Sequence, residues 1–333
     1  MKSCITGALL LVFTLTSVAS SADILGCPNG IPKGTLWPRL NYKVTKMTEK
    51  YDWATGKMVD IGTSGDNSVR AKEQAETDVR IGYGATAALD VAVQAKYRAV
   101  ESESQKKTAG ARRISFSEAS LAELWLAGKY RFIDLTGTGL KSVDYFKLSA
   151  GAAYGFGLAD NLEDIITGLG PGCDKAQLGL LAHGGLSVGV DFAAHLIYEW
   201  WGKAPEYAAT AYLPADEPLE KNHYNFGQSG RDMPDRLDYM FVLEKGITER
   251  IELKAQLAGW LGLQKNRGSL YSAAYRDAGY YAYMHNIVAG LEFYPMGEDY
   301  DKRKFGVQVS LPYSAKNSTA PDYSLTLMSM WTF

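Results

Sequence analysis

The chain has 333 residues, with 35 basic and 37 acidic side chains, so its charge balance does not favour a nucleic-acid partner or a strongly acidic one. No run of about 18 apolar residues follows the N-terminal stretch, which excludes a membrane-spanning helix from the mature protein. Tyrosine is frequent at 21 residues and glycine at 34, and these residues suit membrane interfaces and curved strands.

Residues 1–22 have the pattern of a secretory signal, with a positive start, a short apolar core and small residues before cleavage after Ala22. A lipoprotein signal is the alternative, because residues 24–27 (ILGC) resemble a lipobox, although this tetrapeptide lies far beyond the apolar core. Residues 23–37 are rich in Pro and Gly and show no period. They predict an irregular segment that lies in the periplasm or enters the fold as a plug.

The cysteines leave two pairing states open. Cys4 belongs to the signal, so the mature chain carries Cys27 and Cys173 in an exported, oxidising compartment. A disulfide between them and two free thiols both fit the sequence. The strand order given below puts the two cysteines on opposite sides of a membrane, so a disulfide would require the N-terminal segment to pass through the barrel.

From residue 38 onward, short segments alternate apolar and polar residues, which is the period of β-strands. The clearest pair is 79–85 and 89–98, because only a few residues join them, as in a tight hairpin. The predicted strands are 38–51, 79–85, 89–98, 120–132, 143–157, 176–187, 189–201, 236–245, 250–263, 279–294, 303–313 and 322–333.

Long and short connections alternate between these segments. The long ones are 52–74, 101–113, 158–175, 202–232, 264–278 and 314–321. Outer-membrane barrels show this asymmetry, and an even strand number places both ends of the barrel on one side. The sequence therefore predicts an all-β fold for residues 38–333: a closed antiparallel transmembrane β-barrel of about twelve strands, with short periplasmic turns and long extracellular loops.

The last segment, 322–333, carries an apolar face with aromatic residues at both ends, Tyr323 at one and Trp331 and Phe333 at the other. An edge strand of a soluble sheet is the alternative, but it gives no reason for the alternation of loop lengths. The pattern resembles the terminal strand that the barrel-insertion machinery reads through Phe333. We therefore expect this machinery and the lipid bilayer as partners, in the outer membrane of a Gram-negative bacterium.

Charged residues fall on the strand face opposite the apolar one, and a Lys or Arg facing lipid near mid-membrane would cost about 2–4 kcal/mol. They are therefore predicted to face the lumen, where they pair with one another or select the solute. These candidates are Arg80, Lys96, Arg98, Glu123, Lys129, Arg131, Asp191, His195, Glu199, Glu252 and Lys254. Trp125, Trp201 and Trp260 share the inward parity, from which they would line a path for an aromatic solute.

Catalytic and metal sites find little support. An outer-membrane phospholipase needs a Ser, a His and an orienting Asn, and His285-Asn286 has no matching His-x-Ser motif. His195 and Glu199 are four residues apart, about 13 Å along a strand at ~3.3 Å per residue, which is too far to share one ion. We therefore expect no enzyme, no metal and no cofactor.

Three short motifs, residues 124–132 (LWLAGKYRF), 83–91 (YGATAALDV) and 27–30 (CPNG), resemble the outer-membrane family associated with the meta pathway of phenol degradation. The resemblance spans most of residues 27–333 and implies a porin-like transporter of aromatic or other small hydrophobic compounds, which would pass by diffusion. It supplies no catalytic set. The alternative is a structural or adhesive barrel with a closed lumen, whose loops, chiefly 202–232, bind outside the cell.

Overall fold

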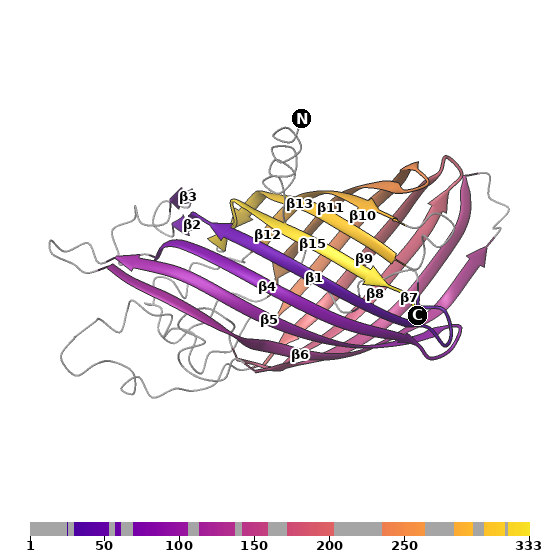
Figure 1. Cartoon of the computed structure of the whole chain (residues 1–333), viewed down its shortest axis with the longest axis horizontal. Helices are drawn as coiled ribbons and strands as arrows, with labels where there is room; N and C mark the ends of the chain where they lie inside the picture. Colours follow the sequence, from indigo (N-terminus) through magenta and orange to yellow (C-terminus); the bar gives the residue numbers. More distant parts are fainter. Residues whose placement is uncertain are drawn as a thin grey trace.

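The computed structural model describes residue 25 and residues 30–52, 57–60, 69–105, 113–136, 142–158, 172–202, 235–263, 283–295, 303–316 and 319–333. Within these ranges, twelve antiparallel strands close into a barrel in the order β1-β15-β13-β12-β11-β10-β9-β8-β7-β6-β5-β4 (Figure 1). The predicted fold class is therefore confirmed. No helix in the described part of the chain is long and apolar enough to cross a bilayer.

The barrel strands differ widely in length. They are β1 (Leu36–Met47), β4 (Val69–Gly84), β5 (Leu89–Gln105), β6 (Arg113–Thr136), β7 (Val143–Gly157), β8 (Lys175–Leu186), β9 (Val190–Trp201), β10 (Arg236–Thr248), β11 (Ile251–Gly262), β12 (Tyr283–Phe293), β13 (Arg303–Lys316) and β15 (Tyr323–Trp331). A separate three-stranded sheet joins β2 (Glu49–Asp52), β3 (Lys57–Asp60) and β14 (Thr319–Ala320).

The barrel closes where its first and last strands meet. β1 pairs with β4 on one side and with β15 on the other. Beyond the last ladder pair, the backbone groups of Leu36 and Phe333 exchange two hydrogen bonds of 3.0 Å. This end also carries the short turns 85–88, 187–189 and 249–250, and we call it the turn end. The opposite loop end carries the small sheet, which lies far from the C-terminus in Figure 1.

The surface of the barrel is apolar outside and polar inside, the reverse of a water-soluble protein. Large hydrophobic side chains on every strand are exposed, for example Leu178 at 63% and Leu253 at 44%. Buried side chains include Lys96, Glu123 and Glu292. Such a surface is stable only where hydrocarbon surrounds the barrel and where no sheet edge is left unpaired. The transmembrane β-barrel fold follows.

Two predicted loops are partly strand. The segment 52–74 was predicted as a loop, but it contains β3 and the start of β4, which begins ten residues before the predicted strand at 79. The segment 101–113 likewise contains the end of β5. These ends lack an apolar face because a strand needs only about 9–11 residues to cross the hydrocarbon, and the remainder stands in water.

Several other predictions lie outside the described residues. They concern the signal at 1–22, Cys27, and most of the long loops at 158–175, 202–232 and 264–278. The boundary between the irregular segment 23–37 and the barrel is at Leu36 in the structure, where β1 begins.

Candidate functional site

The lumen wall holds two groups of ionised side chains that are mostly buried. The central network comprises Glu76, Lys96, Arg98, Glu123 and Lys175, from β4, β5, β6 and β8. The turn-end network comprises Glu244, Glu252, Lys254, Glu292 and Lys304, from β10, β11, β12 and β13. Each network joins strands on one side of the barrel, so the charges are held by the wall itself.

Glu123 is the centre of the central network. Its Oε1 lies 2.7 Å from Lys175 Nζ and 3.1 Å from a terminal nitrogen of Arg98. Its Oε2 lies 3.6 Å from Lys96 Nζ and accepts a 2.8 Å hydrogen bond from Trp125 Nε1. Arg98 also binds Glu76, with Nε 2.6 Å from Oε2. Since three cations share two carboxylates in a buried site, loss of one carboxylate leaves positive charge uncompensated.

The turn-end network surrounds one ammonium group. Lys254 Nζ contacts Glu244, lies 3.0 Å from Glu292 Oε1 and lies 3.7 Å from Glu252 Oε1. Lys304 also contacts Glu292. The network borders a cavity of about 300 Å³ at the turn end of the lumen, which Asp191, Glu244, Glu249, Glu252 and Tyr294 help to line.

At the loop end, tryptophan faces are covered by cations. Arg236 lies between Trp201 and Trp260, with its guanidinium carbon 4.3 and 4.4 Å from the two ring centroids. Lys175 Nζ lies 4.0 Å from the Trp201 centroid on the neighbouring strand. Such contacts are favourable because the ring face is electronegative. The tryptophans that the sequence assigned to an aromatic path therefore hold cations here.

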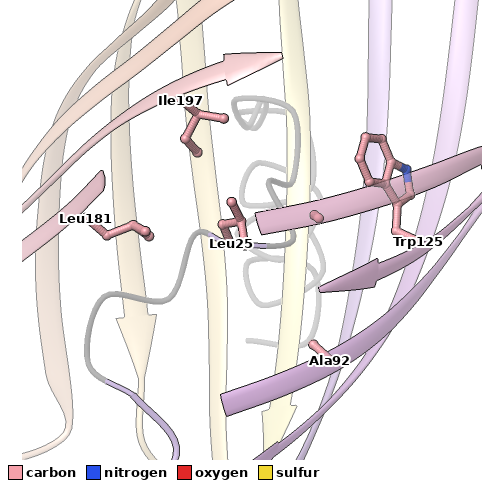
Figure 2. Packing of buried hydrophobic residues seen from close by; sticks show 6 residues of the cluster. Leu25, Ala92, Trp125, Leu181 and Ile197 are labelled. Atoms are coloured by element: carbon pink, nitrogen blue, oxygen red, sulfur yellow. The ribbon is translucent and has the colours of Figure 1, made fainter. Parts of the chain in front are cut away.

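Part of the segment before β1 lies inside the barrel. Leu25 is 1% exposed and belongs to a buried apolar cluster with Leu181 and Ile197 of the wall, and Figure 2 shows it between these residues and Trp125. Nearer the turn end, the Ile31 amide donates a 3.0 Å hydrogen bond to Asp90 Oδ1. The Asp90 carboxylate also lies 3.2 Å from Lys129 Nζ.

The remaining sequence candidates stand apart from both networks. Glu199 accepts hydrogen bonds from Gln177 and Trp201. Arg131 pairs with Asp134 at 3.0 Å near the turn end. Asp191 lines the cavity, His195 is buried, and Arg80 is half-buried opposite Gln94. The structure thus brings Lys96, Arg98 and Glu123 together, and separately Glu252 and Lys254.

Sequence reasoning missed several members of these networks. Glu76 and Lys175 fell at the edges of predicted strands, where the apolar alternation fades. Glu292 and Lys304 have the inward parity but lie one or two residues from a strand end. Inward parity counted to the last residue of each strand would have found both of them.

Cys173 lies just before β8 and is buried, with a free thiol. The structure therefore does not support the Cys27–Cys173 disulfide, and Cys27 lies outside the described residues. Burial raises the pKa of the Cys173 thiol to about 11.

His285, the residue nearest to a hydrolase motif, lies on the outer face. Its Nδ1 is 2.5 Å from the Tyr239 hydroxyl, and its ring stacks on Tyr283 and Tyr313. Among the described residues, no group of three or more His, Cys, Asp or Glu side chains is arranged to hold a metal ion.

No known family model matches the chain, so the resemblance to the phenol-degradation family is not confirmed. No curated protein matches it either. Among solved structures, the COG4313 outer membrane channel from Pseudomonas putida F1 is similar, with a TM-score of 0.60, 14% identity, and coverage of 95% of this chain and 100% of that one. The P. putida toluene transporter TodX has a TM-score of 0.44, 11% identity and 95% coverage of both chains. At these identities the similarity extends to the fold alone.

Proposed function

We propose that this chain forms an outer-membrane channel of a Gram-negative bacterium, through which small hydrophobic or aromatic compounds diffuse without a cofactor or an energy source. The observation that carries the proposal is the apolar cluster of Ala92, Trp125, Ala153, Leu181 and Ile197 on a lumen wall that is otherwise lined by charge. A purely aqueous pore has no need of such a surface, because it leaves water against apolar side chains.

The charged networks support a narrow path. Twelve strands enclose less space than the sixteen to eighteen of an aqueous porin, and paired side chains fill part of that space. The segment that carries Leu25 fills more of it. We infer that residues 23–37 act as a plug that restricts the lumen, and that the turn end faces the periplasm.

A closed-lumen structural or adhesive barrel is the second candidate, and the same tight filling of the lumen favours it. The test is reconstitution of the folded protein into phospholipid vesicles and planar bilayers, with entry of toluene and of glucose measured beside single-channel conductance. We expect toluene entry several times faster than in protein-free vesicles, with little glucose entry. Sealed bilayers and toluene entry equal to that of the empty vesicles would contradict the channel and leave the closed barrel.

A further inference from the structure

Leu25 lies on bare backbone of the barrel wall. Gly151 of β7 and Gly179 of β8 are opposite each other in the ladder. A Cβ added to Gly151 would lie 2.8 Å from Leu25 Cδ2, and one added to Gly179 would lie 3.3 Å from Leu25 Cδ1. The two glycines therefore leave a recess that one apolar group fills, and we call it, with Leu181 and Ile197, the glycine socket.

The rim of the glycine socket is apolar. Leu181 and Ile197 are 1% and 0% exposed, and Ala153 lies near them in the same cluster (Figure 2). Side chains of this kind offer no hydrogen bond, so the socket favours an uncharged apolar group over an ion or a sugar. Because glycine presents only its backbone, a flat ring as well as a branched aliphatic group can approach the wall closely.

The group that fills the socket comes from outside the barrel strands. Ile31, six residues later, is anchored by its amide bond to Asp90, and its side chain packs over Gly82. Six residues reach at most about 20 Å, so Leu25 stays near the socket even when it is undocked. A tether this short corresponds to an effective concentration of about 1 mM or more, against which a free solute competes.

We propose that the glycine socket is a binding site for the apolar group of a passing solute, of the size of a single aromatic ring or a short alkyl chain, and that Leu25 occupies it when no solute is present. This inference rests on the proposed channel function. Solute entry and Leu25 docking then exclude each other, so the solute itself displaces Leu25 from the lumen wall.

The first test follows Leu25 directly. A Leu25→Cys variant, made with Cys27→Ser and Cys173→Ser, is reconstituted into phospholipid vesicles and treated with a water-soluble maleimide. Labelling is measured by mass spectrometry with toluene, or with glucose at the same concentration. We expect toluene to speed labelling about fivefold or more, in proportion to the docked fraction it displaces, and glucose to leave it unchanged. Electrophoretic mobility without heating shows that the barrel stays folded.

The second test narrows the socket. Gly151→Ala places a methyl group against Leu25, whereas a Cβ at Gly128, on the neighbouring strand, meets nothing within 4 Å. In the same cysteine background, Gly151→Ala should raise labelling in the absence of toluene and reduce the response to toluene. Gly128→Ala should behave like the parent. Equal behaviour of the two variants would overturn the socket.

A third test measures affinity. Quenching of Trp125 fluorescence by 4-bromotoluene, taken as the difference from a Trp125→Phe variant, reports occupancy of the cluster. Leu25→Ala should lower the half-quenching concentration about tenfold, because the buried competitor is removed. Unchanged quenching, together with unchanged labelling of the Leu25→Cys variant, would overturn the socket even if toluene still crosses the vesicles. A response in both assays without transport would retain the socket and remove the channel.

Discussion

At the scale of single residues, a glycine on the outer face determines whether two aromatic side chains meet. Gly259 of β11 lies between Tyr239 of β10 and His285 of β12 in the ladder. The Tyr239 hydroxyl passes over this glycine to reach His285 Nδ1 at 2.5 Å. A Cβ at Gly259 would lie 2.6 Å from that hydroxyl and 2.5 Å from the Met284 carbonyl oxygen.

We therefore expect Gly259→Ala to break the Tyr239–His285 hydrogen bond and to lower the free energy of unfolding by about 1–3 kcal/mol, the usual cost of overpacking. Urea unfolding of the reconstituted barrel measures it. Gly128→Ala is the matched control, because a Cβ there meets open space, and it should change the stability little. Equal losses in the two variants would show that the effect is general to glycine in these strands.

The Cys173 thiol gives a prediction about pH. Burial raises its pKa to about 11, so in the folded protein the reactive thiolate is scarce near neutral pH and increases only as the pH approaches 11. In a Cys27→Ser background, maleimide labelling at pH 8 should be about a hundredfold slower in the folded than in the urea-unfolded protein. Labelling at similar rates in both states would show that the thiol is neither buried nor shifted.

At the scale of the elements, the central network links four strands through one carboxylate. Glu123→Gln keeps the shape of the side chain but removes the charge that Lys96, Arg98 and Lys175 share. Leaving those cations uncompensated should lower the free energy of unfolding by about 3–5 kcal/mol. Glu101→Gln, at an exposed position of β5, is the matched control. A small loss at Glu123 would mean that water or ions compensate the lysines.

The seam between β1 and β15 is the other decisive element. Phe333 is 76% exposed, yet its backbone closes the barrel through two hydrogen bonds to Leu36. Deletion of Phe333 removes both bonds and the terminal aromatic, so the fraction of heat-modifiable barrel in the membrane should fall severalfold. Phe333→Tyr keeps both features and should insert normally. Normal insertion of the deletion variant would mean that neither feature is needed for assembly.

At the scale of the whole molecule, the lumen is restricted by charge on its wall and by the segment that carries Leu25. Deletion of residues 23–29 removes Leu25 but leaves the Ile31 anchor and every wall strand in place. Single-channel conductance should rise severalfold, because conductance follows the open cross-section, while thermal stability stays close to that of the parent. A conductance equal to that of the parent would place the constriction in the wall networks.

The amino-acid pattern alone is enough to specify the barrel. Alternating segments such as 89–98 require a sheet with one greasy face, and an isolated sheet edge cannot exist in hydrocarbon, so the sheet must close. The same pattern places Lys96, Glu123 and Lys254 on the inner face, because period two assigns each side chain to a face. It does not specify the ends of β4 and β5, where no bilayer demands an apolar face.

Which inward residues meet depends on the folded barrel. Glu123 and Lys175 are 52 positions apart and come together because the register of β6, β7 and β8 brings their strands to the same height. The glycine socket has the same origin, since nothing in the sequence distinguishes Gly151 and Gly179 until the ladder pairs them beneath Leu25. Period fixes the face of a residue, whereas register and closure fix its neighbours across the lumen.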